Sequence, residues 1–131
     1  MDRTTEERVV AGLTHLGLLL EMAGLIINVV LYVLYRSRSS FVAKHVKQAL
    51  GLQVVSLLLA FAISVIFGAG AIGLGFWSPA GALGSAALAW LLSMVVWVVT
   101  LVLMVIAAVR GFQGEEYQHP VFGNFVDRLG E

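Results

Sequence analysis

The chain has 131 residues, of which 60% are hydrophobic and 12% are charged, and its eight basic residues balance its eight acidic ones. Soluble domains carry about 25% charged residues, and a chain this short cannot bury so much apolar surface, so a soluble globular fold is excluded. The basic residues form no patch large enough for nucleic acid, and the lack of cysteine excludes disulfides and thiolate chemistry.

The first predicted element is a long apolar segment near the N-terminus. Residues 1–8 are polar, and Thr4 and Glu7 are spaced as in a helix capping box. The run over 9–35 follows, with Glu21 as its only charged residue, and it is long enough to cross a bilayer. It exceeds the apolar core of a signal peptide, and the residues before it carry more acid than base, so we expect a retained span.

A basic connector over 36–47 separates this run from the next apolar segment. It contains no acidic residue and four basic ones, Arg36, Arg38, Lys44 and Lys47. No charged residue then appears until Arg110, an interval that accommodates two further spans at about 48–69 and 84–109. Between them, closely spaced glycines and Pro79 predict a Gly-rich loop over 70–83, with a re-entrant segment as the alternative.

These elements predict an all-α integral membrane protein. We expect residues 1–131 to form a single membrane domain, a bundle of three transmembrane helices followed by a short amphipathic C-terminal tail. Lysine and arginine near span ends favour the cytoplasmic side. The connector and the tail are therefore predicted to face the cytoplasm and the N-terminus the outside, in a multi-pass arrangement in the bacterial cytoplasmic membrane.

Polar residues on the predicted spans form a candidate intramembrane site. At helical pitch they lie on one side of their helices, where polar groups can bond across a bundle. The site comprises Glu21, Asn28, Gln53 and Ser56. Glu21 either carries a proton or cation, or is a protonated carboxyl hydrogen-bonded to Asn28, Gln53 or a serine.

The sequence offers no pattern for catalysis, a cofactor or a metal. Its three histidines are scattered, and no ligand spacing such as HExxH occurs. There is also no nucleophile elbow, phosphate loop or pair of carboxylates. We therefore predict no catalytic residue, no metal site and no cofactor, and expect that the protein is not an enzyme.

Three stretches resemble a known family. They are Ala11-Gly-Leu-Thr-His15-Leu, Phe41-Val-Ala-Lys-His45-Val-Lys-Gln48-Ala49-Leu50 and Gly114-Glu-Glu-Tyr-Gln-His-Pro120. In this order they are similar to a bacterial family of small membrane proteins related to the twenty-kilodalton Tic component of the chloroplast import machinery. The resemblance implies a polytopic helical protein and, from the plastid relative, a part in moving polypeptides across a membrane.

Two functional hypotheses follow. The first is an accessory or assembly protein linked to protein translocation or insertion, with the bilayer, a membrane-protein partner or further copies of the chain as its partners. It predicts a cytoplasmic cluster that locks the connector to the tail, or else anchors a turn at the headgroups: His45, Lys47, Gln48, Glu115 and Glu116. The alternative is a small oligomeric transporter or channel that uses Glu21.

Overall fold

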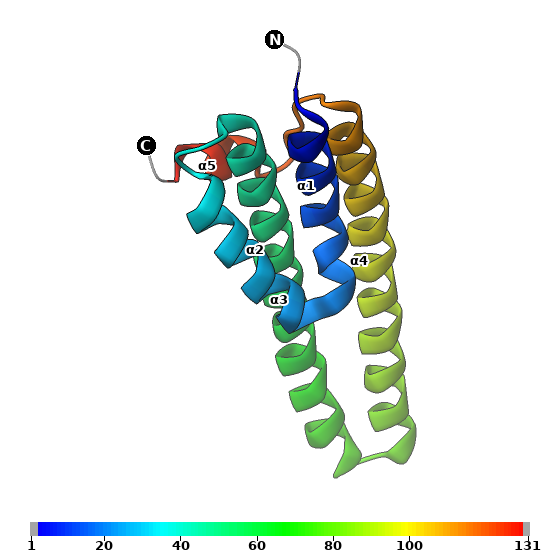
Figure 1. Ribbon diagram of the computed structural model, residues 1–131. Helices are drawn as coiled ribbons and strands as arrows, with labels where there is room; N and C mark the ends of the chain where they lie inside the picture. Colours follow the sequence, from blue (N-terminus) through cyan, green and yellow to red (C-terminus); the bar gives the residue numbers. More distant parts are fainter. Residues whose placement is uncertain (1–2, 130–131) are drawn as a thin grey trace. The chain divides into compact units, whose positions relative to one another are not determined.

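A computed structural model describes residues 3–129, and these residues form helices and turns without any strand (Figure 1). The elements are α1 (Thr5–Leu16), the 3-10 helix η1 (Gly17–Leu20), α2 (Glu21–Tyr35), α3 (Ser40–Gly75), α4 (Pro79–Gln113) and α5 (Gly123–Arg128). Two compact units share the long helices. The first unit comprises Met1–Val54 and Leu101–Glu131, and the second comprises Val55–Thr100.

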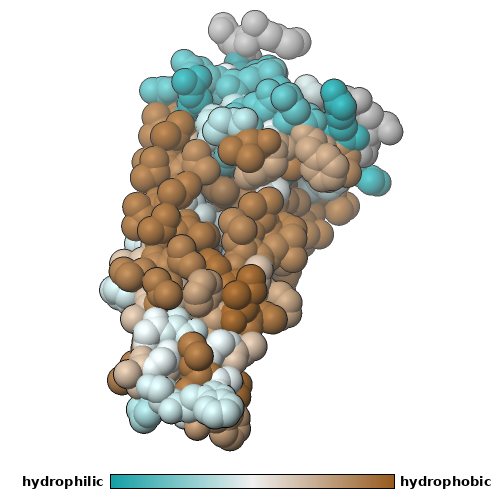
Figure 2. Space-filling view, turned by 180° about the vertical axis from the view of Figure 1, so that it is seen from behind, coloured by the Kyte–Doolittle hydropathy of each residue, from teal (hydrophilic) through white to brown (hydrophobic). Residues whose placement is uncertain are grey.

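The predicted all-α class is confirmed. By length and composition alone, three helical segments could cross a membrane, namely Thr5–Tyr35, which is divided into α1, η1 and α2, Ser40–Gly75 and Pro79–Gln113. Hydrophobic side chains cover the flanks of these helices, whereas hydrophilic ones gather where the connector and the tail lie (Figure 2). Such an outer surface suits hydrocarbon, because a helix satisfies its own backbone polar groups there.

The first of these segments is not straight, which differs from the expectation of a single span with its ends on opposite sides. α1 begins at the predicted capping box, in which Thr4 and Glu7 exchange hydrogen bonds. α2 then returns alongside α1, and the Tyr35 hydroxyl donates to the Glu6 carboxylate over 2.7 Å. The segment is therefore a helical hairpin, and the start of α1 lies at the same end as the connector.

The hairpin turns where two glycines allow the backbone to meet itself. A Cβ atom on Gly24 would lie 1.6 Å from the carbonyl oxygen of Gly17, so no side chain fits there. Between them Glu21 adopts a φ of 49°, which is uncommon for a residue other than glycine. Farther along, the Asn28 side-chain amide donates to the Thr14 carbonyl over 2.9 Å and fastens α2 to α1.

The core of the first unit lies where α1 packs against α3 and α4. A cluster of buried apolar side chains joins α1 to α3: Ala11, Phe41, Val42 and Val46. On the α4 side, a Cβ atom on Gly111 would lie 2.7 Å from the backbone nitrogen of Gly12. The two backbones approach closely because neither residue has a side chain, as is common between helices in membranes.

In the second unit, α3 and α4 form an antiparallel pair with a short loop. The Ser56 and Thr100 hydroxyls lie 3.0 Å apart, and the Ser85 hydroxyl donates to the Phe67 carbonyl over 2.8 Å. The structure differs here from the expected Gly-rich loop over 70–83, because only residues 76–78 lie outside the helices.

Two glycines in this stretch, Gly70 and Gly81, lie where α3 and α4 pack closely. Gly70 faces Ser85, whose hydroxyl oxygen would lie 2.9 Å from an added Cβ atom. Pro79 is the first residue of α4, a position where its missing N–H costs no helical hydrogen bond. Glycine and proline thus shape the helix pair rather than interrupt it.

The hairpin makes a direct prediction about membrane topology. Single cysteines replacing Thr5 and Ser37, both exposed, should react with a membrane-impermeant thiol reagent from the same side of the membrane. The chain has no cysteine of its own to remove. Ser78→Cys, beyond the 36-residue helix α3, is the control and should react from the other side. Labelling of Thr5→Cys and Ser37→Cys from opposite sides would contradict the hairpin.

Candidate functional site

The most elaborate polar site lies where α1, α3 and the C-terminal tail meet within the first unit. We call it the polar junction and define it by five side chains: His15, His45, Gln48, Tyr117 and His119. All five are buried, with exposed fractions between 0% and 7%. Because buried polar groups must be hydrogen-bonded to offset their desolvation, their mutual contacts determine how the tail docks.

All three histidines of the chain meet in the polar junction. Nε2 of His15 lies 3.0 Å from Nδ1 of His45, and Nε2 of His45 lies 2.9 Å from the Glu115 carbonyl oxygen. The His119 ring packs edge-on against His15 at a centroid distance of 6.3 Å, and its Nδ1 lies 3.1 Å from the Tyr117 hydroxyl. The three rings thus join α1, α3 and the tail in one buried contact.

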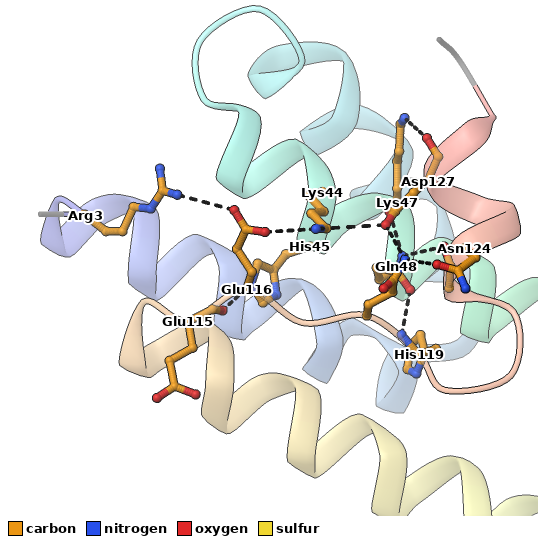
Figure 3. A network of polar contacts seen from close by, with 12 residues as sticks. Arg3, Lys44, His45, Lys47, Gln48, Glu115, Glu116, His119, Asn124 and Asp127 are labelled. Atoms are coloured by element: carbon orange, nitrogen blue, oxygen red, sulfur yellow. Dashed lines mark hydrogen bonds and ion pairs between the residues drawn. The ribbon is translucent and has the colours of Figure 1, made fainter. Parts of the chain in front are cut away.

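Gln48 of α3 holds the tail through both ends of its amide (Figure 3). Its oxygen accepts from the His119 backbone N–H over 3.0 Å. Its nitrogen donates to the Gly123 carbonyl over 3.1 Å and to the Asp127 carboxylate over 2.7 Å. One buried side chain therefore fixes the tail both before and within α5.

Ion pairs surround the polar junction on its solvent side. Lys44 lies 2.9 Å from the Glu116 carboxylate, and Arg3 lies 3.7 Å from the same carboxylate (Figure 3). Arg110 lies 3.3 Å from Glu115. Exposed pairs of this kind contribute on the order of 0–1 kcal/mol each, so they orient the tail more than they stabilise it.

The electrostatic environment of the tail follows from these contacts. The hydrogen bond and the charge of Lys44 lower the pKa of Glu116. Burial lowers the pKa of His119 to about 4, although its backbone hydrogen bond to Gln48 opposes the shift, and burial raises the pKa of Tyr117. Both groups are therefore neutral at pH 7, as a buried contact without counter-ions requires.

The predicted cytoplasmic cluster falls largely within this region. His45 and Gln48 belong to the polar junction, the Glu115 carbonyl contacts His45, and Glu116 pairs with Lys44 beside the junction. Lys47 instead donates to the Asp127 carbonyl oxygen over 3.4 Å. Sequence reasoning missed four participants in the tail contacts: His15, Tyr117, His119 and Asp127. The Tyr and His of the Gly114–Pro120 stretch were visible as a motif, but nothing in the sequence paired them with His15.

The predicted intramembrane site is not brought together as one group. Asn28 and Gln53 do meet, with a hydrogen bond of 3.1 Å between their side chains. Ser56 bonds instead to Thr100 in the second unit. Glu21 is exposed at the hairpin turn and begins α2, where the unpaired N–H groups of a helix start favour a carboxylate.

The contacts of the polar junction are suited to holding the C-terminal tail in place rather than to catalysis. Among residues 3–129, no group of three or more histidine, cysteine, aspartate or glutamate side chains is placed to hold a metal ion. Four histidine nitrogens face one another, a carbonyl or a hydroxyl, and these contacts lock the rings in place, whereas Nδ1 of His15 and Nε2 of His119 are buried without a hydrogen-bond partner among residues 3–129. The polar junction is therefore a latch that holds the tail onto α1 and α3.

Replacement of Gln48 tests the latch. Gln48→Leu leaves the buried His119 N–H without its partner, at a cost of about 1–3 kcal/mol, and removes the bonds to the Gly123 carbonyl and the Asp127 carboxylate. We expect a lower melting temperature in detergent and faster proteolysis of the tail. Gln113→Leu, an exposed position at the end of α4, is the matched control and should leave both unchanged. Equal behaviour of the two variants would contradict the latch.

The low pKa of His119 predicts how tail docking depends on pH. The unfolded side chain takes up a proton near pH 6.5, whereas the docked one does so near pH 4. Docking is therefore fully stable above pH 6.5 and loses stability as the pH falls through that interval. Proteolysis of the tail by an acid-tolerant protease should accelerate over this range. His119→Gln should remove the acceleration, and an unchanged pH profile in this variant would contradict the assignment.

A comparison with known proteins places the chain in a family. A model of the Magnetosome magnetite crystal formation protein family (MamF/MmsF) matches residues 6–126. No curated protein and no solved structure matches the chain.

This match corrects the expected kinship. The chain is not a member of the Tic-related family, so the role in translocation inferred from that resemblance is wrong, and the match does not support the transporter alternative either. The three stretches that carried the resemblance contain His15, His45, Gln48 and His119, which hold the tail in place. These stretches therefore indicate how the chain is packed and do not indicate what it does. Over nearly its whole length, the chain belongs to the magnetosome magnetite crystal formation protein family.

Proposed function

We propose that this protein is an integral component of a magnetosome membrane that takes part in magnetite crystal formation. The observation that carries the proposal is the family match over residues 6–126. The three apolar segments support the membrane location, because their exposed side chains require a hydrocarbon environment.

The proposed orientation rests on the distribution of charge. All eight lysine and arginine residues lie in the first unit, and none lies between Lys47 and Arg110. Under the positive-inside rule, the connector, the tail and the start of α1 face the cytoplasm of a bacterial cell. The membrane itself would be the cytoplasmic membrane or one derived from it.

The proposed role is structural rather than catalytic. No charged residue occurs between Lys47 and Arg110, so the loop after α3 offers no charged group to a mineral surface. Several carboxylates of the first unit are already engaged by the chain itself: Glu6, Glu7, Glu116 and Asp127. These features favour an effect on the crystal exerted through the membrane or through neighbouring membrane proteins.

Deletion of the gene in its own magnetite-forming host tests this function. We expect crystals of altered size, and re-expression of the chain should restore them, as measured by electron microscopy. A re-expressed Gln48→Leu chain should restore them less well than the Gln113→Leu control, because its tail is no longer held. Unchanged crystals in cells shown by immunoblot to lack the protein would contradict the proposal.

A further inference from the structure

Neither helix of the N-terminal hairpin is long enough to cross a bilayer. α1 has 12 residues and α2 has 15, which correspond to about 18 Å and about 22 Å. The hydrocarbon core of a bilayer is about 30 Å thick. Because the segment turns at residues 17–21, α1 and α2 lie side by side in opposite directions. The hairpin can therefore reach into the membrane no farther than the length of one of these helices.

The surface of the hairpin is nevertheless made for hydrocarbon. At the turn, Leu19, Leu20 and Met22 are 57%, 57% and 60% exposed. Along α2 the outward side chains are also apolar: Ile26, Ile27, Val29, Val30, Val33 and Leu34. The turn also carries the exposed Glu21, at the start of α2, where the free N–H groups of the helix favour a carboxylate. Apart from this residue the turn is apolar, so it is unsuited to the aqueous phase or the headgroups of the far side and lies within the membrane.

Both ends of the hairpin are held at the polar end of the first unit. Glu6 accepts a hydrogen bond from Tyr35, and Glu7 accepts one from Ser39 of the connector. Arg8 donates to the Phe112 carbonyl over 2.8 Å and joins α1 to the end of α4. These hydrogen bonds fasten both arms of the hairpin to the connector and to α4.

We propose that the hairpin inserts into one leaflet only, the one next to the connector, and that the protein therefore prefers membranes in which this leaflet is convex. α1 and α2 add cross-sectional area to that leaflet alone, because neither helix is long enough to reach the other leaflet's surface. A convex leaflet has more area to fill, as is known for other shallowly inserted elements that respond to curvature. The partner of this surface is the acyl chains of one leaflet.

The depth of the turn is the first test. A fluorophore on Leu19→Cys in the otherwise unchanged, reconstituted chain should lie near the bilayer centre when probed with lipids that carry a quencher at defined depths. A label on Ser37→Cys in the connector should lie at the headgroups. A Leu19 label at the headgroups of either side would overturn the proposal, and the label replaces an exposed side chain, so the contact between Gly17 and Gly24 is unaltered.

Curvature preference is the second test. Labelled protein in giant phosphatidylcholine–phosphatidylglycerol vesicles, from which thin tubes are pulled, should be denser on the tube than on the vesicle. The fraction with the connector outward is fixed beforehand by reaction of Ser37→Cys with an impermeant reagent. Protein with the connector inward should instead be depleted from the tube.

Two glycine variants distinguish the effect of the hairpin from that of the other helices. Gly24→Leu drives the two arms apart, since its Cβ atom would collide with Gly17, whereas a Cβ atom on Gly73 meets nothing within 4 Å. Gly24→Leu should lose its enrichment on tubes and Gly73→Leu should keep it. Equal densities on tube and vesicle for the wild type, or equal enrichment of both variants, would overturn the proposal. Neither result bears on the role in crystal formation, which is tested separately in cells.

Discussion

The backbone contact between Gly17 and Gly24 is the constraint on which the arrangement of the first unit depends. Because Gly24 lacks a side chain, its backbone can lie against Gly17, and an apolar segment of 31 residues doubles back rather than running straight. Its start then meets the connector, and His15 is carried to the place where α3 and the tail converge. Without that turn, α1 would not be held beside the connector, and only α3 and the tail would form the polar end of the first unit.

The polar junction shows how a membrane protein with few charges secures a terminal segment. Most of its binding comes from neutral donors and acceptors in imidazole, amide and phenol groups, which avoid the cost of burying an unpaired charge. The ion pairs of Lys44, Arg3 and Arg110 lie at the rim, where water lowers both their cost and their benefit. The specificity of docking therefore resides in Gln48 and the histidines.

Hydropathy was sufficient to predict the helices, their apolar surface and the basic connector. It could not reveal the hairpin, because a stripe of Thr14, Gly17, Gly24 and Asn28 looks the same on one long helix as on two that face each other. The glycines near Gly70 were misread as a loop, since in hydrocarbon they allow helices to approach. Helical periodicity placed Asn28 and Gln53 in one candidate site with Glu21 and Ser56 without indicating which of them would meet, and the structure joins only Asn28 to Gln53. His15 and His119 are joined only by tertiary structure.

The position of the latch along the chain has a consequence for biogenesis. Its α1 and α3 components leave the ribosome well before Tyr117 and His119, which follow the last long helix. His45 and Gln48 must therefore enter the membrane region while their final partners are still being synthesised. Closure of the tail is the last step of assembly, so a chain truncated after Gln113 would insert its helices yet keep unsatisfied amide and imidazole groups, a recognisable mark of incompleteness for quality control.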